Sequence, residues 1–85
     1  MEIIYLPRFT REFKKLPKDV KAAAYEKEQW FRLDPFNARL KTHKLHGALE
    51  GFWACSITYH VRLIFDFHDK HTVRFYSIGS HDIYE

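Results

Sequence analysis

Residues 52–67 read FWACSITYHVRLIFDF, and the spacing of apolar side chains in this stretch decides the fold class. Alternate positions hold Trp53, Cys55, Ile57 and Tyr59, and then Val61, Leu63, Phe65 and Phe67. A period of two residues is typical of β-strands with one buried face. A third run, 72–78, follows the short polar segment HDKH. Consecutive strands joined by short turns predict an antiparallel sheet.

Two helices are predicted before this sheet, with a short strand at residues 2–6 in front of them. The first helix begins at Pro7, because proline fits the first turn of a helix, and it ends before Pro17. The second helix spans 18–33 and ends at Asp34, since the residue before a proline is disfavoured in a helix. Its predicted apolar stripe consists of Val20, Ala23, Ala24, Trp30, Phe31 and Leu33. These elements predict an α+β fold, with an N-terminal strand and a two-helix hairpin packed on one face of a small twisted antiparallel sheet.

The predicted packing leaves the other face of the sheet open, and polar residues project from it. If Val61 and Leu63 face the helices, the alternation places His60 and Arg62 on the opposite face. The segment 39–46 leads into the same sheet, and its cations are Arg39, Lys41 and Lys44. We therefore expect a positively charged open face.

The size and composition of the chain limit its function classes. At 85 residues with 46% hydrophobic residues, it forms a single domain, 1–85, with enough apolar material for a core. Its one cysteine, Cys55, excludes an internal disulfide. No run approaches the roughly 20 apolar residues of a membrane helix and no secretory signal is visible, so we expect a cytoplasmic protein without membrane association. The net charge of +3 permits a polyanionic partner without requiring one.

Two histidine pairs, in HKLH (43–46) and HDKH (68–71), raise the possibility of a metal site. Zinc takes three or four nitrogen or sulfur ligands, and neither pair has a CxxC or HExxH motif to complete its coordination. Lys41 and Lys44 beside the first pair would repel a divalent cation. We therefore expect no metal and no cofactor.

Cleavage of RNA by its own 2′-hydroxyl needs only a base, cations to hold the phosphate, and an acid for the departing oxygen. The chain offers His43, Lys44, His60, Arg62, His81 and Tyr84 for these roles. Each also has an ordinary structural explanation: Arg62 as a solvated strand residue, His81 as a turn residue beside Asp82, and Tyr84 as a packed aromatic. The residues alone leave this choice open.

The segments HKLHGALEGFWACSITYHVRLIFDF (43–67) and VRFYSIGSHDIY (73–84) resemble the RelE/ParE superfamily of bacterial type II toxins, and within it the YafQ branch. The resemblance extends over nearly the whole chain. It implies a RelE-like, microbial-ribonuclease-like fold. It also implies an endoribonuclease that cleaves mRNA in the ribosomal A site without a metal and so inhibits translation.

The resemblance also implies roles for individual residues. His43 corresponds to the general base, Arg62 to the phosphate-stabilising arginine, and His81 to the general acid. His60 and Tyr84 complete the catalytic candidates, and the residues expected to bind the RNA backbone are Arg39, Lys41 and Lys44. The sequence departs from the YafQ pattern at Ser56, where relatives carry a histidine, and at His60, where they carry an acid. The closing HDIY is one residue shorter than the usual HDxxY.

The same resemblance implies partners and alternatives. The expected partners are a cognate antitoxin, mRNA and the ribosome, with operator DNA reached only through the antitoxin complex. One alternative is a ParE-like inhibitor of DNA gyrase, which shares the fold but has no need of His43, Arg62 and His81. Another is a catalytically decayed module that only binds its antitoxin.

Overall fold

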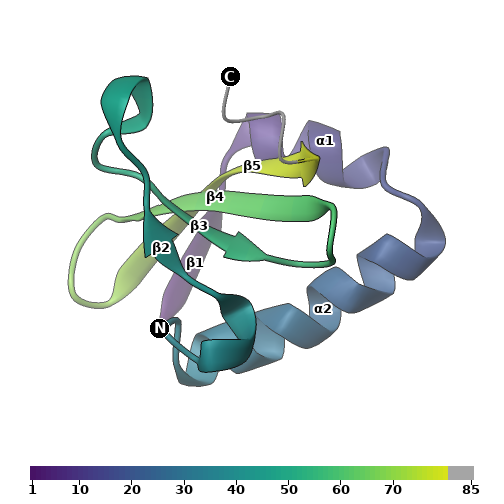
Figure 1. Ribbon diagram of the computed structural model, residues 1–85, viewed down its shortest axis with the longest axis horizontal. Coiled ribbons are helices and arrows are strands. Elements are labelled where there is room, and N and C mark those ends of the chain that lie inside the picture. The colour runs from purple at the N-terminus through teal and green to yellow at the C-terminus, as the bar shows by residue number, and fades with distance from the viewer. Residues whose placement is uncertain (81–85) are drawn as a thin grey trace.

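Five strands form one sheet, in the order β1-β5-β4-β3-β2, in the computed structural model, which describes residues 1–80 (Figure 1). The elements in chain order are β1 (Glu2–Tyr5), α1 (Pro7–Lys14), α2 (Lys18–Leu33), the 3-10 turn η1 (Ala38–Leu40), β2 (His43–Lys44), the 3-10 turn η2 (Gly47–Leu49), β3 (Trp53–Ser56), β4 (Val61–Phe67) and β5 (Thr72–Ser80). The α+β class and the helical hairpin predicted from the sequence are confirmed.

The helices begin and end where proline chemistry predicts. Pro7 occupies the first turn of α1, and Lys15 ends that helix by donating its backbone N–H to the carbonyls of the preceding turn. At the end of α2, Asp34 leaves the helical region with a φ of −161° ahead of Pro35. Figure 1 shows the two helices joined at the right of the view and lying beside the sheet.

The sheet differs from the prediction in one pairing. Strands β2 to β5 are antiparallel neighbours, but β1 runs parallel to β5, with Glu2 opposite Thr72. A parallel neighbour needs a long connection, and here the chain between β1 and β5 contains both helices and the rest of the sheet. The local pattern of residues 2–6 carries no information about this direction.

The turn before β4 is longer than the alternation suggested. β3 ends at Ser56 rather than Tyr59, because the backbone N–H groups of Ile57 and Thr58 both donate to the carbonyl of Val61, at 2.9 and 3.3 Å. Residues 57–60 therefore form a tight connection instead of continuing the strand. This change moves His60 out of the sheet.

Aromatic side chains join α2 to the sheet. Phe31 is 1% exposed, and its ring meets those of Phe65 and Phe75 edge-on, with centroids 4.8 and 5.3 Å apart. Such edge-to-face pairs add to the gain from burying the rings. Leu33, which the predicted stripe placed in the core, is 89% exposed, because the helix ends there and turns it into solvent.

Cys55 is a core residue without thiol reactivity. It is 1% exposed, and burial raises the pKa of its thiol to about 12 although Arg62 acts in the opposite direction. At pH 8 roughly one thiol in 10⁴ would then be ionised in the folded chain.

We expect iodoacetamide to alkylate Cys55 in urea but not in buffer, as measured by mass spectrometry. Equal labelling rates in the two conditions would contradict the buried position.

Candidate functional site

Strand register places His43 and Arg62 on the same face of the sheet. Paired residues share a face, and one row runs from His43 to Ala54, Ile64 and Ser77. The next row contains Ser56, Arg62 and Gly79. Leu63 and Phe65, between these positions along β4, belong to the core under the helices. We call the face that carries His43, Ser56 and Arg62 the open face.

The centre of the open face is apolar and not fully solvated. Ala54 and Ile64 are buried, with exposed fractions of 0% and 1%. Beside them the rings of Phe52 and Tyr76 are in contact, with centroids 5.0 Å apart. The polar candidates therefore surround a small hydrophobic patch. An aromatic pair at this position offers a surface on which a nucleotide base can stack.

Arg62 is held by the turn that precedes it. Its Nη1 donates to the carbonyl oxygens of Thr58 and Tyr59, both at 2.8 Å, and to that of Val61 at 3.3 Å. Within residues 1–80, neither Nε nor Nη2 has a hydrogen-bond acceptor. Three carbonyls thus orient the guanidinium without neutralising it, and its remaining N–H groups can bind a phosphate.

His43 is exposed at the edge of the sheet, in strand β2. Its Nδ1 lies 3.0 Å from the carbonyl oxygen of Lys41, whose backbone adopts the left-handed conformation with φ 53°. A carbonyl only accepts hydrogen bonds, so Nδ1 carries the proton in this contact. In neutral His43 the lone pair is then on Nε2, and this basic nitrogen is the one that does not contact the Lys41 carbonyl.

The three candidate RNA-binding cations are not gathered on one face. Lys44 lies opposite Trp53, on the helix side of the sheet, with Nζ 5.5 Å from the indole ring. Adjacent strand residues point to opposite faces, so Lys44 projects away from His43. Arg39 stacks over Trp30 of α2, with Cζ 4.0 Å from the ring centroid. Lys41 is exposed beside β2.

His60 occupies a position other than the one expected. It lies in the turn 57–60, exposed, with its ring edge-on to that of Tyr59 at 4.9 Å, so strand alternation does not assign it to the open face. His46 is exposed, and its Nδ1 lies 3.8 Å from a carboxylate oxygen of Glu50. His81 and Tyr84 lie outside the described residues.

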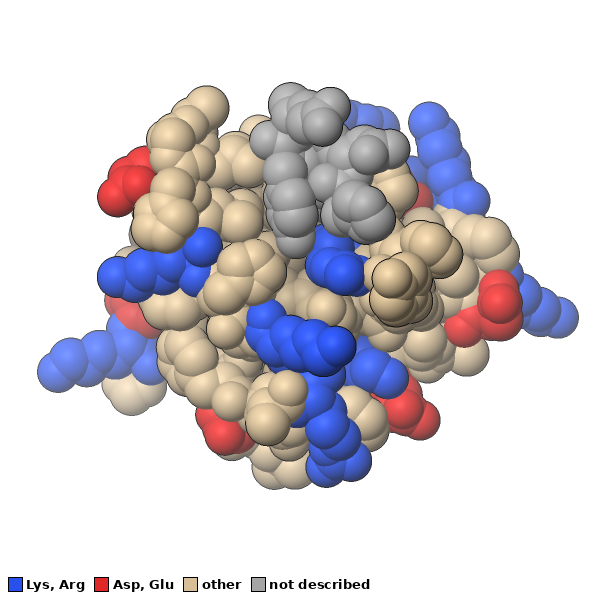
Figure 2. Space-filling model, viewed as in Figure 1, with Lys and Arg blue, Asp and Glu red and all other residues tan. Residues whose placement is uncertain are grey.

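Positive charge is nevertheless concentrated near β2. Figure 2 shows Lys and Arg side chains gathered in the middle and lower part of the view, over η1 and the sheet edge, whereas Asp and Glu lie toward the periphery. Arg39 and Lys41 come from this part of the chain. The charge that could attract a polyanion is therefore at the sheet edge that carries His43.

Sequence reasoning missed an ion pair on the open face. Arg74 donates from Nε and Nη2 to the two carboxylate oxygens of Asp66, at 2.9 and 2.6 Å. The pairing of Asp66 with Arg74 across the β4–β5 hairpin could have been found by counting outward from the turn at 68–71. This pair neutralises both charges and leaves Arg62 as the more available arginine of β4 and β5.

A cavity within residues 1–80 lies on the other side of the sheet. It measures about 440 Å³, opens between the helices and the sheet, and is lined mainly by apolar side chains, among them Phe9, Phe13, Phe31, Cys55 and Leu63. Such a lining cannot stabilise a phosphate, so this cavity is not the candidate site.

Within residues 1–80, no three His, Cys, Asp or Glu side chains are placed to form a metal site. In the same residues, no helix is long and apolar enough to span a membrane.

Comparison with solved structures finds the same fold in bacterial toxins. The YoeB/ParE toxin from Agrobacterium tumefaciens matches with a TM-score of 0.79 at 14% identity, over 95% of this chain and 99% of that one. A chain of the Escherichia coli DinJ–YafQ toxin–antitoxin complex gives 0.77 at 22%, over 96% and 93%. The Staphylococcus aureus YoeB–YefM complex gives 0.77 at 19%, over 95% and 97%. Neither models of protein families nor curated proteins match. The chain thus has the RelE-like toxin fold of these proteins, as its resemblance to the RelE/ParE superfamily implied.

Proposed function

We propose that this chain is the toxin of a type II toxin–antitoxin pair and acts as a metal-independent, ribosome-dependent mRNA endoribonuclease. The observation that carries the proposal is the shared face of His43 and Arg62. His43 is an exposed base, and within residues 1–80 the Nε and Nη2 groups of Arg62 have no acceptor. The toxin fold supports the same conclusion.

The chemistry would proceed by attack within the RNA. Nε2 of His43 takes the proton of a 2′-hydroxyl, whose oxygen attacks the adjacent phosphorus. Arg62 stabilises the charge that develops on the phosphate oxygens. The bond to the 5′-oxygen breaks, and His81 donates a proton to that oxygen. The products are a 2′,3′-cyclic phosphate and a 5′-hydroxyl. Lys41 would bind the RNA backbone beside the cleaved phosphate.

The partners follow from the same proposal. The toxin would act on mRNA in the ribosomal A site, in the cytoplasm, until a cognate antitoxin covers it. Two of the similar solved structures are complexes of a toxin with its antitoxin. The antitoxin would present acidic groups to the cationic region around η1, and operator DNA would be bound only through that complex.

The decisive experiment maps nucleic-acid damage in cells that express the chain alone. We expect in-frame cuts in mRNA with 5′-hydroxyl ends, and about a hundredfold less cleavage for Arg62→Ala, the size of effect seen when one donor to a charged transition state is removed. Arg74→Ala, on the same face, should retain cleavage. Intact mRNA together with DNA damage would instead support gyrase inhibition, and intact nucleic acids would support a decayed module.

A further inference from the structure

Within residues 1–80, strand β1 covers only the first half of one edge of β5. It pairs with β5 from Thr72 to Phe75, and beyond that register the backbone N–H of Leu6 donates to the carbonyl of Phe75 at 3.1 Å. The register with β4 also shifts there, so that Tyr76 is an extra residue between Phe75 and Ser77. Such bulges bend a strand and occur near functional sites.

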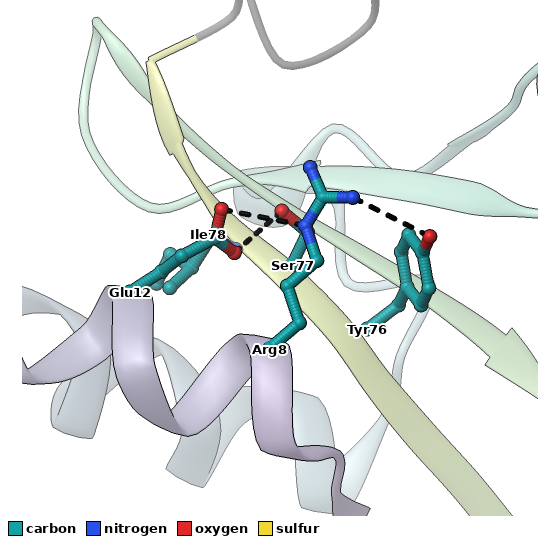
Figure 3. Close-up of polar contacts among 5 residues, drawn as sticks. All are labelled: Arg8, Glu12, Tyr76, Ser77 and Ile78. Atoms are coloured by element: carbon teal, nitrogen blue, oxygen red, sulfur yellow. Dashed lines mark hydrogen bonds and ion pairs between the residues drawn. The ribbon is translucent and has the colours of Figure 1, made fainter.

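A carboxylate from α1 binds the edge of β5 beyond the part that is paired with β1. Oε1 of Glu12 accepts hydrogen bonds from the hydroxyl of Ser77 at 2.7 Å and from the backbone N–H of Ile78 at 3.2 Å (Figure 3). Ser77 is fully buried, and this contact satisfies its hydroxyl. Glu12 therefore forms hydrogen bonds with the edge of β5 directly after the bulge.

The same carboxylate is connected to the open face through Arg8. Oε2 of Glu12 lies 3.5 Å from Nε of Arg8, and Nη1 of Arg8 lies 3.5 Å from the hydroxyl of Tyr76, as Figure 3 shows. The guanidinium also lies over the Tyr76 ring, 5.2 Å from its centroid. Glu12 thus has partners at both carboxylate oxygens, and it connects α1 directly to Ser77 and Ile78 and through Arg8 to the bulge residue Tyr76.

The segment held by Glu12 leads to both parts of the proposed site. Gly79, the residue after Ile78, lies opposite Arg62 on β4. Ser80 is the last residue of β5, and His81 follows it in the chain. We infer that Glu12 is a positioning residue for the proposed nuclease: it fixes the part of β5 that pairs with Arg62. This inference rests on the proposed function.

The test measures kcat and KM for cleavage of mRNA on ribosomes with purified variants. Glu12→Ala should lower kcat roughly 10- to 100-fold with little change in KM, the effect expected when reacting groups are misplaced by about 1 Å. Glu12→Gln keeps an acceptor for Ser77 and Ile78 and should recover most of the activity. Hydrogen exchange at the Ile78 amide should be faster in Glu12→Ala only.

Glu28→Ala is the matched control, because Glu28 is also a helix carboxylate that is paired with an arginine, Arg32, and accepts a hydroxyl hydrogen bond, from Tyr5, but it lies far from the end of β5 in the chain. It should keep the wild-type kcat. An equal loss in Glu28→Ala, or wild-type kcat in Glu12→Ala, would overturn the positioning role. If the wild-type chain itself leaves mRNA intact, the proposed nuclease function fails, whereas a cleaving wild type beside an unaffected Glu12→Ala variant rejects only the inference about Glu12.

Discussion

His43→Ala is expected to lower the kcat of mRNA cleavage by about 10²- to 10⁴-fold, the contribution usual for a general base. The contact between Nδ1 and the Lys41 carbonyl leaves Nε2 as the basic nitrogen, and alanine removes it. KM should change little, because His43 acts on the proton of the attacking hydroxyl and does not hold the RNA backbone. Single-turnover cleavage on programmed ribosomes measures the two parameters separately.

His46→Ala provides the control in the same stretch. His46 is exposed like His43 and is three residues away, but its nearest charged group is Glu50. The variant should cleave at the wild-type rate. Equal losses in the two variants would indicate that the loop binds the ribosome through both histidines, and would remove the assignment of His43 as the base.

Phe31→Ala is expected to lower the free energy of unfolding by about 3–5 kcal/mol, the cost typical of removing a buried aromatic ring. Phe31 is 1% exposed and contacts both Phe65 and Phe75, so its loss leaves a void between α2 and the sheet. Domains of this size are stable by roughly 5–15 kcal/mol, so the expected loss is a large fraction of the total stability. Urea denaturation followed by circular dichroism measures the change.

Leu33→Ala, two residues further along α2, is the matched comparison. Its side chain is 89% exposed, and we expect a change within about 0.5 kcal/mol. A large destabilisation by Leu33→Ala, or a small one by Phe31→Ala, would mean that α2 packs through a different face than the one described.

The fold was predictable where local chemistry determines it. Prolines set the bounds of the helices, and the period of two residues predicted the strand that contains Val61–Phe67. The parallel direction of β1 was not predictable, because it depends on a partner at the far end of the chain. Leu33 was misplaced because periodicity continues to the last helical residue, whereas burial ends where the sheet no longer lies beneath the helix.

The site was predictable in part. Alternation placed Arg62 on the face opposite the core, as the register shows. It failed for His60, because two backbone hydrogen bonds to Val61 end β3 early. It also failed for Lys44: the segment 39–46 looked like a loop, but a two-residue strand there sends His43 and Lys44 to opposite faces. The role of Glu12 at β5 gave no sequence signal, since its partners in that strand are more than 60 positions away.

The pairing of β1 with β5 has a consequence for the order of folding. It joins residue 2 to residue 72, so the first strand has no partner until the last strand has been synthesised. Contacts between such distant segments slow folding, because the loop between them must close before they are gained. A nascent chain that lacks β5 would also lack the partner of Arg62 and the segment bound by Glu12. The proposed activity would therefore arise only after β5 has been synthesised and has paired with β4.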